Sequence, residues 1–317
     1  MRALACPASL KGVVEAVDAA HHLAAGLRRG GADAVELPVA DGGEGTADVL
    51  QRVLGGHWRS ARVSDPLGRP VDARWLELPD GTAVVESAAA AGLPLLAPEE
   101  RDPLRASSRG VGELLAAALA ERPAAVLVGV GGVATVDGGD GLAETIGPWP
   151  AGVPLQVLCD VRNPLLGPRG AARVFGPQKG ADPEAVEELE RRLAARPDLA
   201  PYRDLPGAGA AGGLGAALAS LGGRLVRGAE TILDRIGFDE LARGADLVVT
   251  GEGTADATTL EGKAPGAVRD RCARLGVRCV LFGGLVRDGV DALPLSGDPH
   301  RAVEDLEALG RRLAGGD

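Results

Sequence analysis

The chain has 317 residues, of which 45% are hydrophobic and only 2% aromatic, and its formal net charge is -10. This length allows two hydrophobic cores, and the acidic balance argues against nucleic acid or an anionic membrane as a partner. No stretch approaches the roughly 18 apolar residues of a membrane-spanning helix, and the apolar run before Pro7 is too short for a signal peptide, so we expect a cytoplasmic protein.

The first part of the chain alternates strands and helices. The pattern predicts a buried strand at residues 2–6, a turn at 7–12, a helix to about 29, a strand at 34–39, a loop at 41–46 and a helix to 54. This order predicts parallel strands in an α/β layer. Ligands of such folds bind at the carboxyl ends of the strands.

The pattern changes between residues 59 and 86. Short alternating segments at 61–63, 71–75 and 82–86 are separated by turn sequences that contain Pro66, Gly68, Pro79 and Gly81, which predicts antiparallel strands. We therefore expect the chain to cross into a second unit near residue 80.

The α/β order resumes in the second half. We expect helices at 110–121, 183–195 and within 206–219, strands at 125–130, 155–159, 247–250 and 279–282, and glycine-rich loops at 131–141, 251–253 and 283–284.

The three lysines of the chain are an unusual feature, because all its other basic residues except four histidines are arginines. Lys11, Lys179 and Lys263 each adjoin a glycine in a predicted loop. A lysine ammonium is compact where a guanidinium is planar and extended, and glycine lets the backbone approach a ligand closely. The pattern indicates phosphate binding.

The sequence has five such glycine-rich loops, at residues 7–12, 41–45, 131–141, 176–180 and 251–263, and three of them, 41–45, 131–141 and 251–263, contain carboxylates. Carboxylates repel phosphate unless a divalent cation lies between them. Lysines, carboxylates and glycine loops in combination therefore predict phosphoryl transfer with Mg²⁺.

Three local motifs give weaker evidence of function. Residues 207–212 match GxGxxG but do not follow an apolar strand, and Gly262-Lys263 lacks the other residues of a phosphate-binding P-loop. Asn163 precedes a proline just past a predicted strand, where it either initiates a turn or orients a substrate hydroxyl.

The motifs together resemble the bacterial type I glycerate kinase family, in the family's order over about residues 4–285. The matching segments are 7–12, 38–46, 65–68, 86–94, 131–141, 159–170, 175–180, 205–214, 250–253 and 262–265.

The resemblance implies ATP-dependent phosphorylation of D-glycerate, with 2-phosphoglycerate expected as product rather than 3-phosphoglycerate. It implies an α/β fold of two domains with a cleft between them. One is Rossmann-like and discontinuous, which we place at 1–80 plus 283–317, and the other is an inserted α/β domain at 81–282. Glycerate is the expected small-molecule partner, and a homodimer is left open.

We assign roles to the residues of these loops as hypotheses. Lys11 and Lys263 neutralise charge on the transferring phosphoryl group, and Asp41 and Glu44, with Asp256, hold Mg²⁺ or the substrate hydroxyl. Asp41, Asp160 and Asp256 are alternative general bases, and the role of Lys179 is open. The expected nucleotide-binding residues are Ser9, Gly12, Gly42, Gly43, Gly131, Gly132, Asp137, Gly138, Gly139, Asn163, Gly251, Glu252 and Gly253.

The chain departs from the family pattern at five positions. Ala8 replaces an acidic residue, Val133 and Val136 replace serine and asparagine, and Thr254 and Thr258 stand where the family usually has other polar residues. These changes motivate an alternative function, a non-catalytic or substrate-shifted relative that binds nucleotide or a small hydroxy acid.

Overall fold

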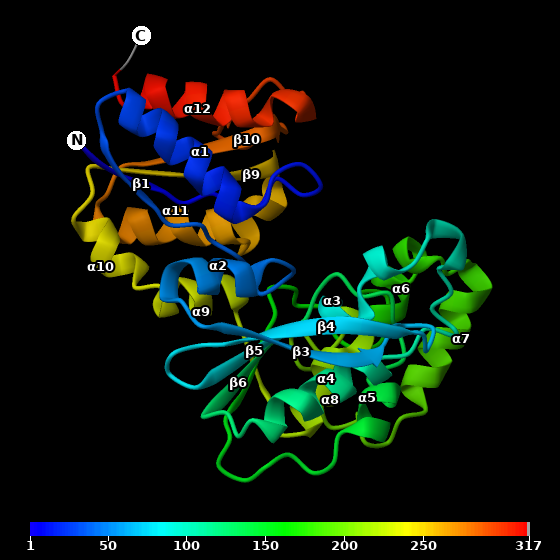
Figure 1. Ribbon diagram of the computed structural model, residues 1–317. Helices are drawn as coiled ribbons and strands as arrows, with labels where there is room; N and C mark the ends of the chain where they lie inside the picture. The colour runs from blue at the N-terminus through cyan, green and yellow to red at the C-terminus, as the bar shows by residue number, and fades with distance from the viewer. Residues whose placement is uncertain (316–317) are drawn as a thin grey trace. The chain divides into compact units, whose positions relative to one another are not determined.

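The computed structural model describes residues 1–315, apart from the side chains of residues 260 and 261. Two compact units are visible in Figure 1. Unit 1 contains Met1–Asp41, Asp48–Leu54 and the chain from Ala229 onward, and unit 2 contains Gly42–Ala47 and Gly55–Gly228. Among the described residues, no helix is long and apolar enough to cross a membrane.

The boundaries of these units differ from the expected crossings at residues 80 and 283. Unit 2 begins at Gly55 because the antiparallel strands after it pair with the sheet of that unit. It ends at Gly228 because residues Leu247–Ala255 form a strand between two strands of unit 1. Long-range strand pairing, which leaves no local mark in the sequence, therefore sets both boundaries.

Unit 1 is built on a parallel sheet of five strands in the order β11-β10-β9-β1-β2. The strands are β1 (Arg2–Ala5), β2 (Asp33–Glu36), β9 (Leu247–Ala255), β10 (Cys279–Val286) and β11 (Leu293–Pro294). The helices of this part of the chain are α1 (Ala16–Arg29), α2 (Thr46–Leu54), α9 (Gly228–Arg235), α10 (Phe238–Arg243), α11 (Ala264–Leu275) and α12 (Ala302–Leu313). In Figure 1, α1 and α12 lie side by side on one face of the sheet and α11 lies on the other.

The helices of unit 1 pack closely through small residues. A Cβ at Gly26 of α1 would lie 2.2 Å from the carbonyl oxygen of Glu307 in α12, and a Cβ at Gly310 of α12 would lie 2.5 Å from that of Leu23. Real Cβ atoms do not approach so closely, so glycine is required at this helix crossing. Leu23, Leu27, Leu306 and other apolar side chains fill the core beneath it.

Unit 2 is built on a mixed sheet of six strands in the order β3-β4-β5-β6-β7-β8. The strands are β3 (His57–Ser64), β4 (Pro70–Glu77), β5 (Thr82–Glu86), β6 (Ala125–Gly129), β7 (Leu155–Leu158) and β8 (Arg224–Val226). The expected antiparallel segments pair as β3-β4-β5, and the strands from β5 to β8 are parallel. The helices are α3 (Ala88–Ala91), α4 (Arg109–Ala120), α5 (Asp140–Thr145), α6 (Ala171–Phe175), α7 (Pro183–Ala194) and α8 (Leu214–Ser220).

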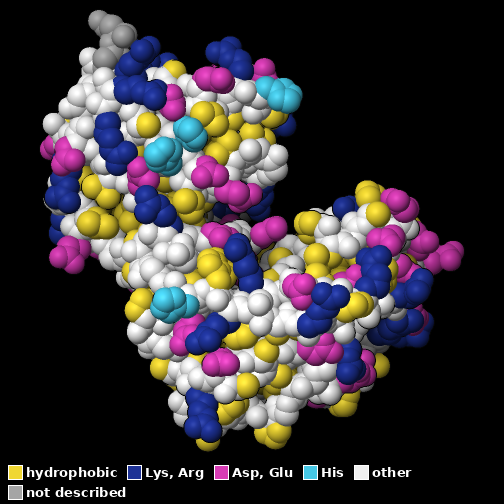
Figure 2. Space-filling model, viewed as in Figure 1, with side chains coloured by type: hydrophobic (Ala, Val, Ile, Leu, Met, Phe, Trp, Pro, Cys, Tyr) yellow, Lys and Arg dark blue, Asp and Glu magenta, His cyan; other side chains and the backbone are white. Residues whose placement is uncertain are grey.

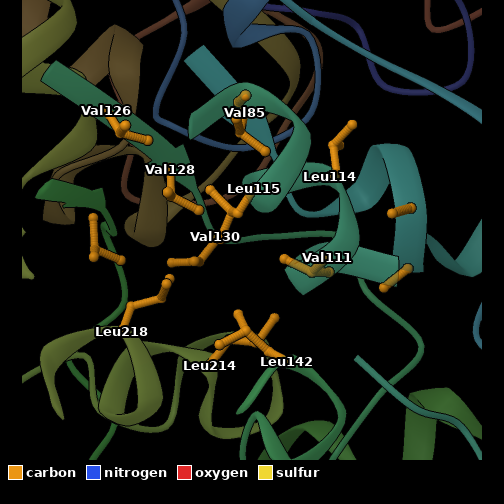
Figure 3. Packing of buried hydrophobic residues seen from close by; sticks show 14 of the residues in the cluster. Val85, Val111, Leu114, Leu115, Val126, Val128, Val130, Leu142, Leu214 and Leu218 are labelled. Atoms are coloured by element: carbon orange, nitrogen blue, oxygen red, sulfur yellow. The ribbon is translucent and has the colours of Figure 1, made fainter. Parts of the chain in front are cut away.

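The core of unit 2 is aliphatic, as the low aromatic content predicts. Figure 3 shows valines of β5 and β6 facing leucines of α4 and α8. β-branched residues in the strands and leucine in the helices follow the intrinsic preferences of the two structures. This packing fixes the end of β6, from which the glycine-rich loop of unit 2 departs.

Residues 251–253 are the main local error of the sequence interpretation. We expected a loop, but β9 continues through them to Ala255, paired in parallel with β10. A Cβ at Gly251 would lie 2.5 Å from the ring of Phe282, and one at Gly284 would lie 2.6 Å from the carbonyl oxygen of Gly253. Glycine here allows close contact between neighbouring backbones and side chains, not a turn.

Candidate functional site

A charged cluster lies at the carboxyl end of β9 in unit 1. Lys263 Nζ is 3.5 Å from Glu252 Oε2 and 4.0 Å from Asp256 Oδ1. The other Glu252 oxygen accepts a 2.7 Å hydrogen bond from the hydroxyl of Thr259, which is completely buried. One lysine is therefore held by two carboxylates, of which Glu252 is nearly inaccessible to solvent.

The segment that carries Asp256 is folded by its own hydrogen bonds. Asp256 Oδ1 accepts from the backbone N–H and the hydroxyl of Thr258, and the Asp256 N–H donates to the Thr259 hydroxyl. The Thr258 hydrogen bond, with the charge of Lys263, lowers the pKa of Asp256 from its usual value. Asp256 therefore remains a carboxylate suited to holding a cation.

Thr259 is a site residue that the sequence interpretation missed. It joins Glu252 to the turn at Asp256 through a single hydroxyl. The available signal was the capping pattern in which Asp256 is followed three residues later by a threonine that returns a hydrogen bond.

Lys263 occupies an electrostatically unfavourable position. It is the residue immediately before α11, whose N-terminal end carries a partial positive charge. The helix gives no structural reason for a cation there, since an acidic or hydroxyl residue is preferred. The adjacent carboxylates offset the cost, and an anion bound at this end would offset it further.

The loop after β1 brings Lys11 to the same edge of the sheet. The Ala8 N–H donates to the Gly251 carbonyl, and a Cβ at Gly253 would lie 3.4 Å from Leu10 Cα. The Lys11 side chain is exposed. Of the other expected residues in unit 1, Ser9 and Asp41 are half-buried, and Gly12 adopts a left-handed backbone with φ of 74°.

In unit 2, the segment Gly42–Ala47 lies against the loop that follows β6. A Cβ at Gly129 would lie 2.5 Å from the Gly42 carbonyl oxygen, and one at Gly131 would lie 3.4 Å from Gly43 Cα. The exposed Glu44 carboxylate lies 3.7 Å from the position of a Cβ on Gly132. The structure thus brings together five of the expected residues: Gly42, Gly43, Glu44, Gly131 and Gly132.

Asp160 and Asn163, after β7, both make hydrogen bonds to the backbone of unit 2. Asp160 Oδ1 accepts from the Gly228 N–H at 2.9 Å, and Asn163 Nδ2 donates to the Arg169 carbonyl at 2.8 Å. The turn interpretation of Asn163 therefore has a direct structural basis, because its amide closes the loop in which it lies.

Asp137, expected to bind nucleotide, organises the loop before α5. Its carboxylate accepts from the Ser108 N–H and hydroxyl, both at 2.8 Å, and from the N–H groups of Gly139 and Gly141 at 3.1 and 3.2 Å. Ser108 is completely buried. These bonds satisfy donors that the interior would otherwise leave unpaired.

We expect Asp137→Ala to destabilise unit 2 by about 3 kcal/mol, because it leaves buried donors unpaired. All three tryptophans, Trp58, Trp75 and Trp149, belong to unit 2, so urea unfolding followed by tryptophan fluorescence measures this unit. The control is Asp140→Ala, which removes a carboxylate paired with Arg196 at the surface and should cost less than ~1 kcal/mol. Equal unfolding midpoints for the two variants would contradict the role given to Asp137.

Lys179 differs from the other two lysines because it is buried. Its side chain is 3% exposed, and Nζ donates a 2.8 Å hydrogen bond to the Thr135 carbonyl. Burial lowers the pKa of Lys179 to about 7, against the opposing effect of the Asp137 charge. Through this hydrogen bond, the buried Lys179 stabilises the loop that follows β6 in unit 2.

Two of the departures from the family pattern are also buried. Val133 and Val136 are 2% and 1% exposed and lie in two hydrophobic clusters of unit 2. Their side chains do not face solvent, so here they contribute to packing. Ala8 and Thr254 are half-buried, and Thr258 is exposed.

The expected catalytic residues are distributed over both units. Lys11, Asp41, Asp256 and Lys263 belong to unit 1, and Asp160 belongs to unit 2. The two expected metal ligands are also divided, since Asp41 belongs to unit 1 and Glu44 to unit 2. Within the described residues, no group of three or more His, Cys, Asp or Glu side chains is arranged to hold a metal ion.

Comparison with known proteins gives a consistent result. The sequence matches the model of the Glycerate kinase family over residues 3–149 and 148–300. A glycerate kinase of Bacillus subtilis (strain 168) is 37% identical, covering 99% of this chain and 97% of its own. A glycerate 2-kinase of Escherichia coli (strain K12) is 36% identical, covering 92% and 87%. A crystal structure from Salmonella typhimurium LT2, of a candidate glycerate kinase 2, has a TM-score of 0.84 at 33% identity and covers 99% of this chain and 97% of that chain.

Proposed function

Since this chain belongs to the glycerate kinase family, we propose that it transfers the γ-phosphoryl group of ATP to D-glycerate. The observation that supports this most directly is Lys263, a cation kept at the N-terminal end of α11 by Glu252 and Asp256. Phosphoryl transfer depends mainly on positioning and charge stabilisation. A lysine already oriented by carboxylates supplies both.

The proposed reaction is a direct transfer. The glycerate hydroxyl oxygen forms a bond to the γ-phosphorus while the bond to the β–γ bridging oxygen breaks, and ADP leaves. The hydroxyl proton passes to a carboxylate. The lowered pKa of Asp256 makes its carboxylate a weak proton acceptor, so we favour Asp41 or Asp160 as the base.

The carboxylate donors fit Mg²⁺. This ion usually keeps several water ligands and binds one or two protein carboxylates together with substrate phosphates, so a preformed group of three protein ligands is not required. We propose Asp41 and Glu44 as its ligands, with Asp256 as an additional candidate. When bound, Mg²⁺ neutralises charge on the phosphates.

We propose 2-phosphoglycerate as the product. Incubation with ATP, Mg²⁺ and D-glycerate, followed by phosphorus-31 NMR, identifies the ester directly. A phosphate on the secondary carbon couples to one proton and gives a doublet, whereas one on the primary carbon couples to two and gives a triplet. A triplet would assign the transfer to the 3-hydroxyl.

Lys11→Arg tests whether the retained lysines act through their compact ammonium. We expect kcat/KM to fall at least ~10-fold, the scale of one charge-assisted contact made in the transition state. The matched control is Lys179→Arg, in which the same change falls on a buried lysine, so that its principal effect should be on stability. Wild-type activity in Lys11→Arg would contradict the interpretation that a lysine, and not an arginine, is required at this position.

The alternative, a non-catalytic relative, rests on Ala8, Val133 and Val136. The buried packing of Val133 and Val136 weakens it, because neither side chain faces solvent. Calorimetry that detects binding of ATP-Mg²⁺ and glycerate, with no phosphoglycerate after long incubation, would favour this alternative.

We also propose a cytoplasmic location, and that neither nucleic acid nor membrane is a partner. On the face shown in Figure 2, basic and acidic side chains are interspersed and form no basic stripe. A homodimer is a further proposal, which sedimentation would test.

A further inference from the structure

A cavity of about 190 Å³ lies within unit 1, at the carboxyl edge of its parallel sheet. Its lining comes from the loop that follows β1, from the C-terminal parts of β9 and β10, and from the chain after β11. These strands belong to one sheet in which every pairing is parallel. This edge is where open α/β sheets bind their ligands.

The cavity has apolar walls that are exposed to solvent. Val13 and Leu285 line it and are 42% and 48% exposed. Among the side chains that the structure describes, they are two of only six large hydrophobic ones exposed to this degree. Isolated exposed apolar side chains are ordinary, but two that converge on one cavity indicate a ligand surface.

The charges around the cavity favour a neutral group inside it. Its lining contains one cation, Lys11, and two carboxylates, Asp298 and Asp305. Asp305 accepts hydrogen bonds from the Ser296 N–H and hydroxyl, and Asp298 accepts from the His300 N–H. Asp305 also lies 3.8 Å from Arg301 Nη2, so the lining carries little net charge, which suits an uncharged heterocycle better than the glycerate carboxylate or the phosphates.

The cavity and the charged cluster share strand β9. Thr254 lines the cavity and stands opposite Leu285 in the strand register. Glu252, which holds Lys263, is two residues before Thr254 and therefore on the same face of the strand, about 7 Å away. A group in the cavity could thus extend a charged chain past Lys11 toward Lys263.

We infer that this cavity binds the base of the nucleotide, with Val13 and Leu285 packed against the heterocycle and Lys11 at the start of the phosphates. The inference rests on the proposed ATP-dependent function and deepens it. It adds a specificity surface whose two exposed apolar walls, Val13 and Leu285, lie outside the glycine-rich loops of the sequence.

Leu285→Asp and Val13→Asp test the inference, because both side chains are exposed and the variants should fold. Each replaces an apolar wall by a negative charge, and we expect the KM for ATP to rise at least ~10-fold, with the KM for glycerate within ~2-fold of wild type. The matched controls are Leu205→Asp and Val174→Asp, which make the same changes at similarly exposed positions of unit 2 and should leave both KM values unchanged.

Calorimetric titration with ADP separates this inference from the proposed function, since it requires no turnover. If wild type binds ADP and Leu285→Asp binds it at least ~10-fold more weakly, the cavity assignment stands even if no phosphoglycerate forms. If wild type phosphorylates glycerate but both cavity variants keep the wild-type KM for ATP, the assignment is overturned while the function stands. A rise confined to the KM for glycerate, or no binding of ADP to wild type, also overturns it.

Discussion

Replacing Lys263 by methionine is expected to lower kcat/KM for glycerate phosphorylation by at least ~100-fold. Methionine preserves the apolar stem but removes the ammonium that we propose stabilises the transferring phosphoryl group, and one such contact typically accounts for two to three orders of magnitude. The measurement is the initial rate with ATP, Mg²⁺ and D-glycerate over a range of both substrates.

Two variants separate catalysis from structure. Arg274→Met removes an exposed cation from the same helix, α11, and should change kcat/KM by less than ~2-fold. Lys263→Arg keeps the charge but changes its geometry, and should recover part of the lost activity. If Lys263→Met stays within ~3-fold of wild type, the cluster at the end of β9 has only a structural role.

Lys179→Met is expected to flatten the pH dependence of unit 2 stability above pH 7. The folded-state pKa of Lys179 is about 7, below its ordinary value of 10.5. Below pH 7 both states carry the proton, so the cost of burying the ammonium is fully present. Between pH 7 and 10.5 the unfolded chain binds more protons than the folded one, so stability rises with pH by up to about 1.4 kcal/mol per unit.

Over pH 7–9, this linkage corresponds to about 2 kcal/mol of added wild-type stability that the methionine variant should lack. Urea unfolding followed by tryptophan fluorescence measures it, because all three tryptophans lie in unit 2. Gln178→Met is the control: the adjacent side chain is exposed and cannot titrate, so that variant should keep the wild-type slope. The same slope in Lys179→Met and wild type would show that Lys179 does not lose its proton on folding near pH 7.

Local structure was largely predictable because it depends on local patterns. The alternation of apolar and polar residues predicted the antiparallel segments that correspond to β3, β4 and β5. The helical spacing of apolar residues predicted the bounds of α4 and α7 within about one residue. The interpretation failed at residues 251–253, where glycine serves close strand contact with Phe282. Glycine occurs both in turns and in closely packed strands, and only the position of the neighbouring strand shows which of the two a given glycine serves.

Unit boundaries could not be read from the sequence. The prediction assigned residues 229–282 to the inserted domain because they continue the strand-and-helix rhythm that precedes them. The structure pairs β9 with β1, which begins 245 residues earlier in the chain. Parallel strands can pair across any length of intervening chain, so the rhythm alone carries no information about which sheet a strand joins.

The candidate site, too, was predictable only in part. Its residue types were evident from the sequence, but Asp137 and Asn163 bind backbone groups of unit 2. The apolar walls of the cavity, Val13 and Leu285, lie outside the predicted loops. Short polar side chains in loops serve either ligands or the backbone. Their three-dimensional neighbours decide between the two.

By itself, the sequence determined the family, through motifs kept in order along the chain, and it predicted phosphate chemistry from three lysines beside glycines. Only the tertiary structure decided how those lysines differ. Lys11 is exposed, Lys263 is paired with Glu252, and Lys179 is buried against Thr135, which lies 44 residues away in sequence. The charge and accessibility of a lysine depend on the water and the groups that surround it, and distant segments supply both.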